Sequence, residues 1–101
     1  MKQSPRLTHA TLKVLSVFLF AGCDERSGAE VAASTKLASG TLYPILLRCE
    51  RAGWLKSRWE EVDPREAGRP RRRLYRITAV GAAQTKSAIF DIVPKGAVSW
   101  A

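Results

Sequence analysis

The chain has 101 residues and a formal net charge of +8, with 17 lysines and arginines against nine aspartates and glutamates. This length corresponds to one small domain with a modest core, which association with a second copy would stabilise. The basic excess favours a polyanionic partner, nucleic acid first. Because the sequence has no phosphate-binding glycine loop, nucleophile elbow or catalytic pair of carboxylates, we expect a binding protein without a cofactor or metal and not an enzyme.

The amino-terminal part is predicted to be a loose arm followed by a helix. Residues 1–7 are short, polar and basic, as is typical of an unanchored terminus. Residues 8–22 begin with Thr8, a suitable cap, and are apolar nearly all round. A helix of this kind must be covered on more than one side. We therefore expect one side to pack within the domain and another against a partner subunit.

The same segment allows a second interpretation, an exported lipoprotein processed at Cys23. Basic residues precede an apolar run that ends in Ala-Gly-Cys, as in a bacterial lipoprotein signal peptide. However, Phe20 stands where leucine is usual, and cleavage before Cys23 would delete the first helix. The run is also too short to span a bilayer. We therefore favour a cytoplasmic protein that does not contact a membrane.

Two helices joined by a short turn are predicted in residues 27–53. Ser27 can cap the first helix, with Glu30 as its capping-box partner, and the helix continues to about Ser34. The second helix has an apolar stripe at positions i, i+3, i+4 and i+7, formed by Leu42, Ile45, Leu46 and Cys49, and Gly53 is a plausible stop just past its end. A short helix followed by an amphipathic helix with a basic outer face is a helix-turn-helix signature.

The sequence leaves the start of the second helix open. If Thr41 caps it, Pro44 lies in the first turn, where proline costs nothing. If the helix begins at Ala38 or Ser39, Pro44 leaves a carbonyl unpaired and bends the helix slightly. In both cases the outer face carries groups that can donate to phosphate oxygens or base edges, namely those of Thr41, Tyr43, Arg48 and Arg51.

A β-hairpin with a long connection, a wing, is predicted in residues 54–78. Residues 54–62 and 72–78 each contain apolar side chains among charged ones, as strands do. The connection, residues 63–70, holds two prolines and a glycine and is too long for a tight turn. Residues 65–76 hold six arginines against one glutamate. Such a density repels itself on a bare surface and is relieved when phosphates neutralise it.

A final helix is predicted in residues 79–93, capped by Thr78 and followed by an unassigned tail, residues 94–101. Its apolar stripe is thin, so its core looks weak without a partner. Cys23 and Cys49 lack the Cys-x-x-Cys or histidine-rich surroundings of a zinc site. We expect both to be small buried hydrophobes.

Two sequence blocks resemble the PadR family of winged-helix transcriptional regulators. GTLYP at residues 40–44 leads into a helix that ends at Gly-Trp-Leu, residues 53–55, and a Pro-basic-Tyr-Arg-Ile-Thr block follows at residues 70–78. Trp-Glu-Glu, residues 59–61, lies between them, and the likeness covers roughly residues 8–81. The resemblance implies an α+β, mainly α fold. This is a winged helix-turn-helix with a two-stranded hairpin wing, flanked by N- and C-terminal helices that form a dimer.

The resemblance also implies a homodimeric, sequence-specific regulator, most often a repressor, bound to a palindromic operator in double-stranded DNA. The second helix of the helix-turn-helix would enter the major groove, while the wing holds adjacent phosphates or reaches the minor groove. The expected DNA contacts are Lys36, Ser39, Gly40, Thr41, Tyr43, Arg48, Arg69, Arg71, Arg72 and Arg73. The expected dimer contacts are Leu12, Leu15, Leu19, Ile89, Phe90 and Val93.

The main alternative is a basic protein that binds RNA or DNA without sequence choice. RNA-binding domains usually expose aromatic side chains on which bases stack. Trp54, Trp59 and Tyr75 are expected to be partly covered as strand residues. The sequence therefore favours duplex DNA.

Overall fold

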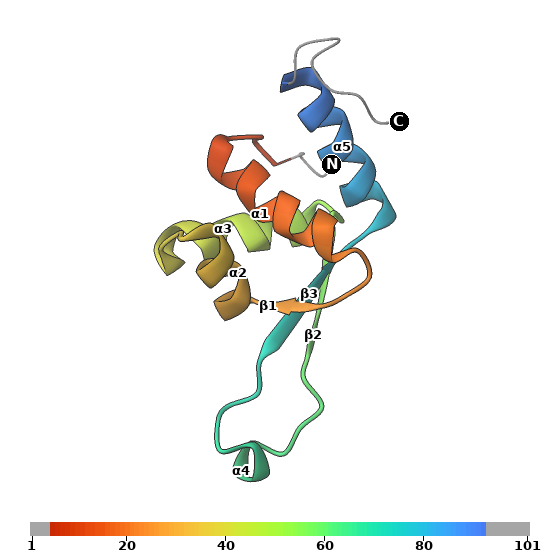
Figure 1. Ribbon diagram of the computed structural model, residues 1–101. Coiled ribbons are helices and arrows are strands. Elements are labelled where there is room, and N and C mark those ends of the chain that lie inside the picture. Colours follow the sequence, from red (N-terminus) through yellow and green to blue (C-terminus); the bar gives the residue numbers. More distant parts are fainter. Residues whose placement is uncertain (1–4, 93–101) are drawn as a thin grey trace.

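The computed structural model describes residues 5–92, in which three helices are followed by a long hairpin and a last helix (Figure 1). The elements are α1 (His9–Ala21), β1 (Arg26–Ser27), α2 (Gly28–Thr35), α3 (Ser39–Arg51), β2 (Leu55–Trp59), α4 (Pro64–Ala67), β3 (Arg73–Ile77) and α5 (Ala79–Ile92). The fold is α+β and mainly helical, as the sequence predicts. The expected dimer contact Val93 and the tail lie outside the described residues.

Both α1 and α2 begin at the caps that the sequence predicts. The hydroxyl of Thr8 accepts a hydrogen bond from the backbone N–H of Thr11 at 3.2 Å. The Ser27 hydroxyl accepts from the N–H of Glu30, whose carboxylate accepts from the N–H of Ser27, both at 3.2 Å. Each bond satisfies a donor that a helix start leaves without an intrahelical partner.

The start of α3 at Ser39 decides between the two predicted alternatives. Ala38 occupies the capping position without a side-chain hydrogen bond, and Pro44 lies inside the helix. Proline has no N–H, so the carbonyl of Gly40 receives no bond from the residue four positions later. Gly40 is exposed, and water can bond this carbonyl. The helix ends at Arg51, and Gly53 follows just past its end as predicted, with a φ of 80° that is favourable for glycine.

The sheet has three antiparallel strands in the order β1-β3-β2, one more than the predicted hairpin. β2 pairs with β3 from Leu55 opposite Ile77 to Trp59 opposite Arg73. The two-residue β1, directly before α2, pairs with the other edge of β3. Two residues are too few to show an alternating pattern, so periodicity does not reveal this strand. The connection between β2 and β3 also contains α4, a single turn capped by Asp63, where the sequence indicated only a loop.

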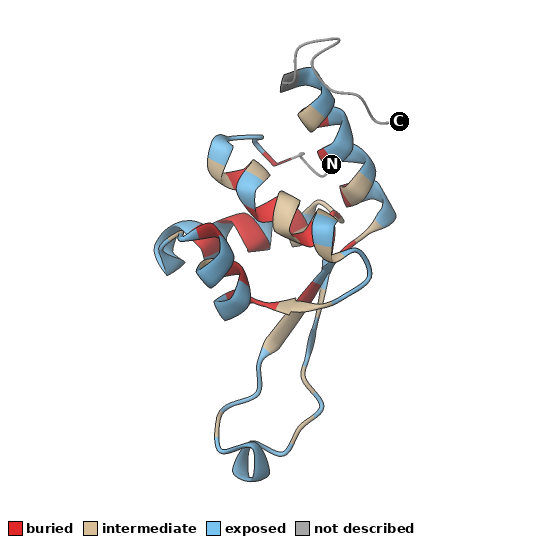
Figure 2. Ribbon diagram, viewed as in Figure 1, coloured by how far each residue is buried: buried red, intermediate tan, exposed pale blue. Residues whose placement is uncertain are grey.

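The core lies where α1, α2 and α3 pack over one end of the sheet, and the hairpin extends from it (Figure 2). The predicted apolar stripe of α3 is buried. Phe18 of α1 meets Tyr75 of β3 edge to face, with ring centroids 6.5 Å apart. The cluster consists of Val14, Leu15, Phe18, Val31, Leu42, Ile45, Leu46, Cys49, Trp54, Leu55, Tyr75 and Ile77. No described helix is long and apolar enough to cross a membrane.

Three side chains lie elsewhere than expected. Cys23 is exposed, because α1 ends before it, whereas Cys49 is buried as predicted and burial raises its pKa to about 11. Trp59, expected to be partly covered, is 58% exposed at the last position of β2. Leu15, expected at a dimer contact, is fully buried in the core of its own chain and has no surface left for a partner.

α5 is fixed to the end of α3 through Thr78, its predicted cap. The Thr78 hydroxyl accepts from the N–H of Gly81 at 3.0 Å and lies 2.6 Å from the carbonyl oxygen of Gly53, to which it donates. Gly81 has no room for a side chain, since a Cβ there would collide with the carbonyl oxygen of Trp54. α5 then runs beside α1.

Candidate nucleic-acid interface

The turn between α2 and α3 sets the position of α3. Lys36 ends α2 in the left-handed conformation, with φ of 63°, and its N–H donates to the carbonyl of Ala32 at 2.8 Å. The buried Thr35 hydroxyl donates to the carbonyl of Val31 at 2.8 Å and accepts from the N–H of Leu37 at 3.3 Å. These bonds fix the turn, while the Lys36 side chain is exposed beside the start of α3.

The outer face of α3 presents the predicted contact residues to solvent. Ser39, Gly40 and Thr41 form the exposed first turn, and Arg48 is exposed two turns further along. Within the described residues, the Arg48 side chain has no hydrogen-bond or ion-pair partner. The buried stripe on the opposite face holds the helix, so these side chains are free to meet a ligand.

Tyr43 links α3 to the first residue of α2. A Cβ placed on Gly28 would lie 2.6 Å from the Tyr43 hydroxyl oxygen, so the phenol packs directly on that backbone. The side chain is nevertheless 48% exposed. Glycine at this position therefore permits the close approach, and Tyr43 both packs against α2 and faces solvent.

A groove of about 510 Å³ runs between α2, Tyr43 and the wing. Its lining includes no carboxylate and four arginines, namely Arg69, Arg71, Arg72 and Arg73. The structure thus brings the wing arginines together with Tyr43 in one groove. Lys36, the first turn of α3 and Arg48 are not part of the groove lining and lie on the outer side of the helix-turn-helix.

Two of these arginines are already paired with acids. Arg69 holds Glu60 through two hydrogen bonds of 2.6 and 3.0 Å. These bonds, more than any other contact, lower the pKa of Glu60 to about 2. Arg73 donates to the Ser57 hydroxyl at 3.0 Å and lies 3.8 Å from the Glu50 carboxylate.

The other two arginines keep donors available. Arg71 donates through its Nε to the carbonyl of Val62 at 2.9 Å, which leaves its terminal nitrogens pointing elsewhere. The exposed Arg72 side chain has no hydrogen-bond or ion-pair partner in the described part of the chain, although its backbone N–H donates to Glu60 at 3.2 Å. The structure therefore divides an arginine run that looked uniform in the sequence.

Sequence reasoning missed a further pair, Arg58 of β2 and Glu25 before β1. The guanidinium donates two hydrogen bonds of 2.7 and 2.6 Å to the carboxylate. This hydrogen bonding is the main cause that lowers the pKa of Glu25. The two residues are 33 positions apart. Only the unpredicted strand β1 brings them together, so no local pattern signals the pair. Among the residues that the structure describes, no cluster of histidine, cysteine and carboxylate groups could hold a metal ion.

A helix-turn-helix followed by an antiparallel sheet whose hairpin extends as a wing defines a winged-helix protein. The model of the transcriptional regulator PadR-like family matches residues 24–87. The chain belongs to this family.

Solved structures show the same fold. A PadR family transcription regulator from Clostridium difficile R20291 is 21% identical, with a TM-score of 0.69 over 83% of this chain and 86% of that one. A PadR family regulator from Eggerthella lenta is 23% identical, with a TM-score of 0.67 over 81% and 70%. A transcriptional regulator from Clostridium thermocellum is 27% identical, with a TM-score of 0.65 over 81% and 80%. None of the curated proteins matches this chain.

Proposed function

We propose that this protein is a cytoplasmic, sequence-specific repressor that binds a palindromic operator as a homodimer. The observation that carries the proposal is the groove lined by four arginines, two of them without an acid partner in the described residues, and by Tyr43 of α3, the helix whose outer face is exposed and basic. In this arrangement α3 enters the major groove, and the wing follows the adjacent backbone. Occupying a promoter in this way blocks transcription without any chemistry by the protein.

The proposed contacts have different roles. Thr41, Tyr43 and Arg48 are the candidates for base edges, because they project from the body of α3, and Arg48 can bond a guanine at two atoms. Lys36, with Ser39 and Gly40 at the helix start, lies where the phosphate backbone would pass. In the wing, Arg71 and Arg72 are the leading phosphate contacts, while Arg69 and Arg73 are held by Glu60 and Glu50.

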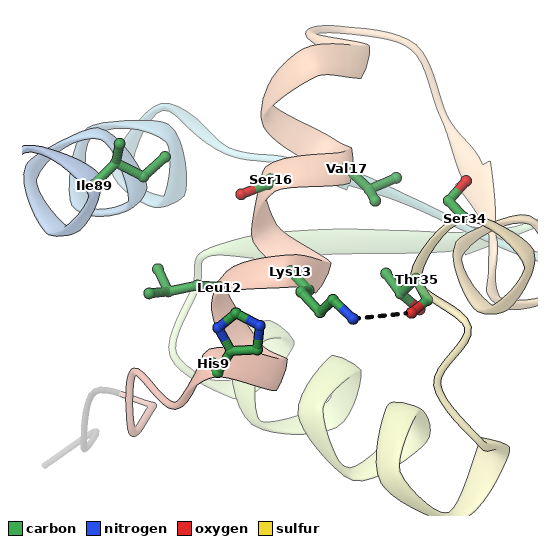
Figure 3. Close-up of a pocket in the computed structure, with 8 residues that line it drawn as sticks. All are labelled: His9, Leu12, Lys13, Ser16, Val17, Ser34, Thr35 and Ile89. Carbon is green, nitrogen blue, oxygen red and sulfur yellow. Dashed lines mark hydrogen bonds between the residues drawn. The ribbon is translucent and has the colours of Figure 1, made fainter. Parts of the chain in front are cut away.

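The proposed dimer uses α1 and α5. Leu12 of α1 and Ile89 of α5 line an apolar groove of about 380 Å³, which Lys13 borders on the α2 side by donating to the Thr35 carbonyl at 3.4 Å (Figure 3). Leu19 is half-buried, and Phe90 is 62% exposed. A second copy related by a two-fold axis would cover this surface. It would also set two half-sites about one DNA turn, roughly 34 Å, apart or a multiple of it.

Sedimentation of charged variants tests the dimer. Leu12→Glu and, separately, Ile89→Glu should shift the protein toward a monomer, because each buries a charge in the proposed interface. Gln84→Glu adds the same charge at an exposed position of α5 and should leave the assembly unchanged. A wild type that is folded and monomeric at micromolar concentration would contradict the dimer.

The operator is tested by selecting fragments of the host genome that the protein binds. We expect a small set of sequences that share an imperfect palindrome and lie near promoters. Reporter transcription from such a promoter should fall when the protein is present. A selection that recovers fragments without any shared sequence would refute sequence-specific regulation.

A nucleic-acid-binding protein without sequence choice is the second candidate, and the exposed ring of Trp59 favours it. Stacking aromatics are typical of single-strand and RNA recognition. Competition between duplex DNA of defined sequence and bulk RNA separates the two functions. The regulator should prefer the duplex, whereas equal competition by RNA would favour the second candidate.

The lipoprotein interpretation conflicts with the contribution of α1 to the core. Cleavage before Cys23 would remove Val14, Leu15 and Phe18, all fully buried. Each of these three losses should lower the free energy of unfolding by about 2–5 kcal/mol, the usual magnitude for truncating a buried side chain. The intact mass of the protein from its native host should therefore include residues 1–22 without lipid.

A further inference from the structure

The exposed indole of Trp59 has no role in the contacts proposed above for the sequence-specific regulator. It stands at the last position of β2, 58% exposed, and lines the groove that holds Tyr43 and the four wing arginines. Tryptophan offers one of the largest apolar surfaces of any side chain, and leaving it in water forgoes much of the stabilisation that burial provides. A partner that covers the ring would therefore gain this free energy.

The ring is held in place by a chain of polar contacts that leads back to α3. The guanidinium carbon of Arg73 lies over the indole, 5.1 Å from the ring centroid, as in a cation–π pair. Arg73 is itself bonded to Ser57 at 3.0 Å, and the Ser57 hydroxyl donates to the carboxylate of Glu50 on α3. These contacts connect the indole to the helix as well as to the wing.

These contacts separate the role of Arg73 from that of Arg72. Arg73 donates to Ser57 and lies 3.8 Å from the Glu50 carboxylate, whereas the exposed Arg72 side chain has no hydrogen-bond or ion-pair partner in the described residues. Because Arg73 lies over the indole of Trp59, it restricts the motion of this ring, which then loses less entropy when a ligand covers it. Arg73 therefore fits a positioning residue for the ring better than a phosphate ligand.

We propose that Trp59 is an apolar DNA contact, whose indole packs against the deoxyribose of a backbone strand held in this groove, with Arg73 and Glu50 as its positioning residues. The inference rests on the proposed function, since it requires duplex DNA in the groove. Arg71 and Arg72 supply cations for phosphates, and each phosphate is followed along the strand by a sugar whose C–H groups form an apolar surface. An aromatic ring that lines the same groove as these cations matches that alternation of charge and apolar surface.

Salt dependence distinguishes this contact from an ionic one. The slope of log affinity against log salt counts the phosphates that the protein neutralises, and an apolar contact adds nothing to it. Trp59→Ala should weaken binding to duplex DNA on the order of tenfold, by the usual value of buried apolar surface, with an unchanged slope. Trp59→Phe should retain most of the affinity. Arg72→Ala is the positive control, because it should flatten the slope in the same assay if the assay detects a lost phosphate contact.

A charge-balanced variant tests the positioning role. Arg73→Ala combined with Glu50→Gln removes one positive and one negative charge, so the net charge near the groove is unchanged. The variant should bind more weakly with the wild-type slope, and the emission of Trp59 in the free protein should change because its ring is released. A phosphate-binding Arg73 would instead flatten the slope by about 0.9.

Fluorescence reports the contact directly. In a Trp100→Phe background, the described tryptophans are Trp54, which is only 4% exposed, and Trp59. Adding duplex DNA should change the tryptophan emission of this protein, and the change should be absent when Trp59→Phe is added. Wild-type affinity and slope in a folded Trp59→Ala protein, or an emission that DNA leaves unaltered, would overturn this inference alone. A wild type that binds no duplex would overturn the proposed function with it.

Discussion

The division of the wing arginines into paired and available side chains leads to a quantitative prediction. Arg72→Ala removes a guanidinium with no side-chain partner in the described residues. Arg69→Ala together with Glu60→Gln removes an arginine that is already neutralised by two hydrogen bonds of 2.6 and 3.0 Å, along with the charge that neutralises it. We expect only the first change to reduce the number of phosphates that the protein contacts.

The magnitude follows from counterion release. Each lost phosphate contact lowers the slope of log affinity against log salt by about 0.9. Between 50 and 200 mM salt, a fourfold range, one contact corresponds to a factor of about 3.5 in affinity. The advantage of the wild type over Arg72→Ala should therefore shrink by about this factor across the range. The double variant at Arg69 and Glu60 should show no such change.

Fluorescence anisotropy of a labelled duplex at four salt concentrations is a suitable assay. The same three proteins should be measured on the operator and on random duplex, where the slopes should change alike, because phosphates carry no sequence information. A double variant whose slope flattens as much as that of Arg72→Ala would refute the reasoning, since Arg69 would then exchange Glu60 for DNA. An unchanged slope for Arg72→Ala would refute its assignment to a phosphate.

Three further predictions concern stability. Gly81→Ala should lower the free energy of unfolding by about 1–3 kcal/mol in urea titrations, because its Cβ meets the carbonyl of Trp54 and α5 must move. Lys36→Gly should raise the free energy of unfolding by up to about 1 kcal/mol, because glycine adopts the left-handed conformation of this position without the strain that lysine has there. DNA affinity should fall with the lost charge. A variant less stable than the wild type would contradict this account of Lys36. The Arg69 hydrogen bonds lower the pKa of Glu60 to about 2, so their stabilisation is present above the unfolded value of about 4.3 and is lost as the pH falls toward 2. The stability difference between the wild type and Glu60→Gln should therefore shrink over this pH window, and a difference independent of pH would contradict the pairing.

The sequence predicted the elements that local patterns specify. The stripe from Leu42 to Cys49 gave α3, and the capping box of Ser27 and Glu30 gave the start of α2. It did not decide whether Thr41 caps α3 or the helix begins at Ala38 or Ser39, because more than one residue of this stretch is of a type that caps helices. Propensity alone could not rank the two starts, since Pro44 is compatible with each at a small cost.

The parts of the site that depend on long-range pairing could not be predicted. The family motifs predicted which arginines of the wing contact DNA, but the partners of Arg58 and Arg69 lie 33 and nine residues away and meet them only in the folded sheet. The exposure of Trp59 has the same origin, because alternation gives the face of a strand and not how far the hairpin extends beyond the helices. Local periodicity thus fixed the framework, and tertiary contacts decided which charges remain available.

The ratio of operator affinity to random-duplex affinity at one fixed salt concentration, for the wild type and for Arg48→Ala, tests the central claim most directly. Arg48 lies off the buried stripe of α3, so the variant should fold as the wild type does. If α3 reads bases through this side chain, the loss should be about 1–3 kcal/mol on the operator and much smaller on random duplex, so the ratio falls. A folded Arg48→Ala protein with the wild-type ratio would contradict base recognition by Arg48. If Thr41→Ala and Tyr43→Phe also kept the wild-type ratio, α3 would not read the operator.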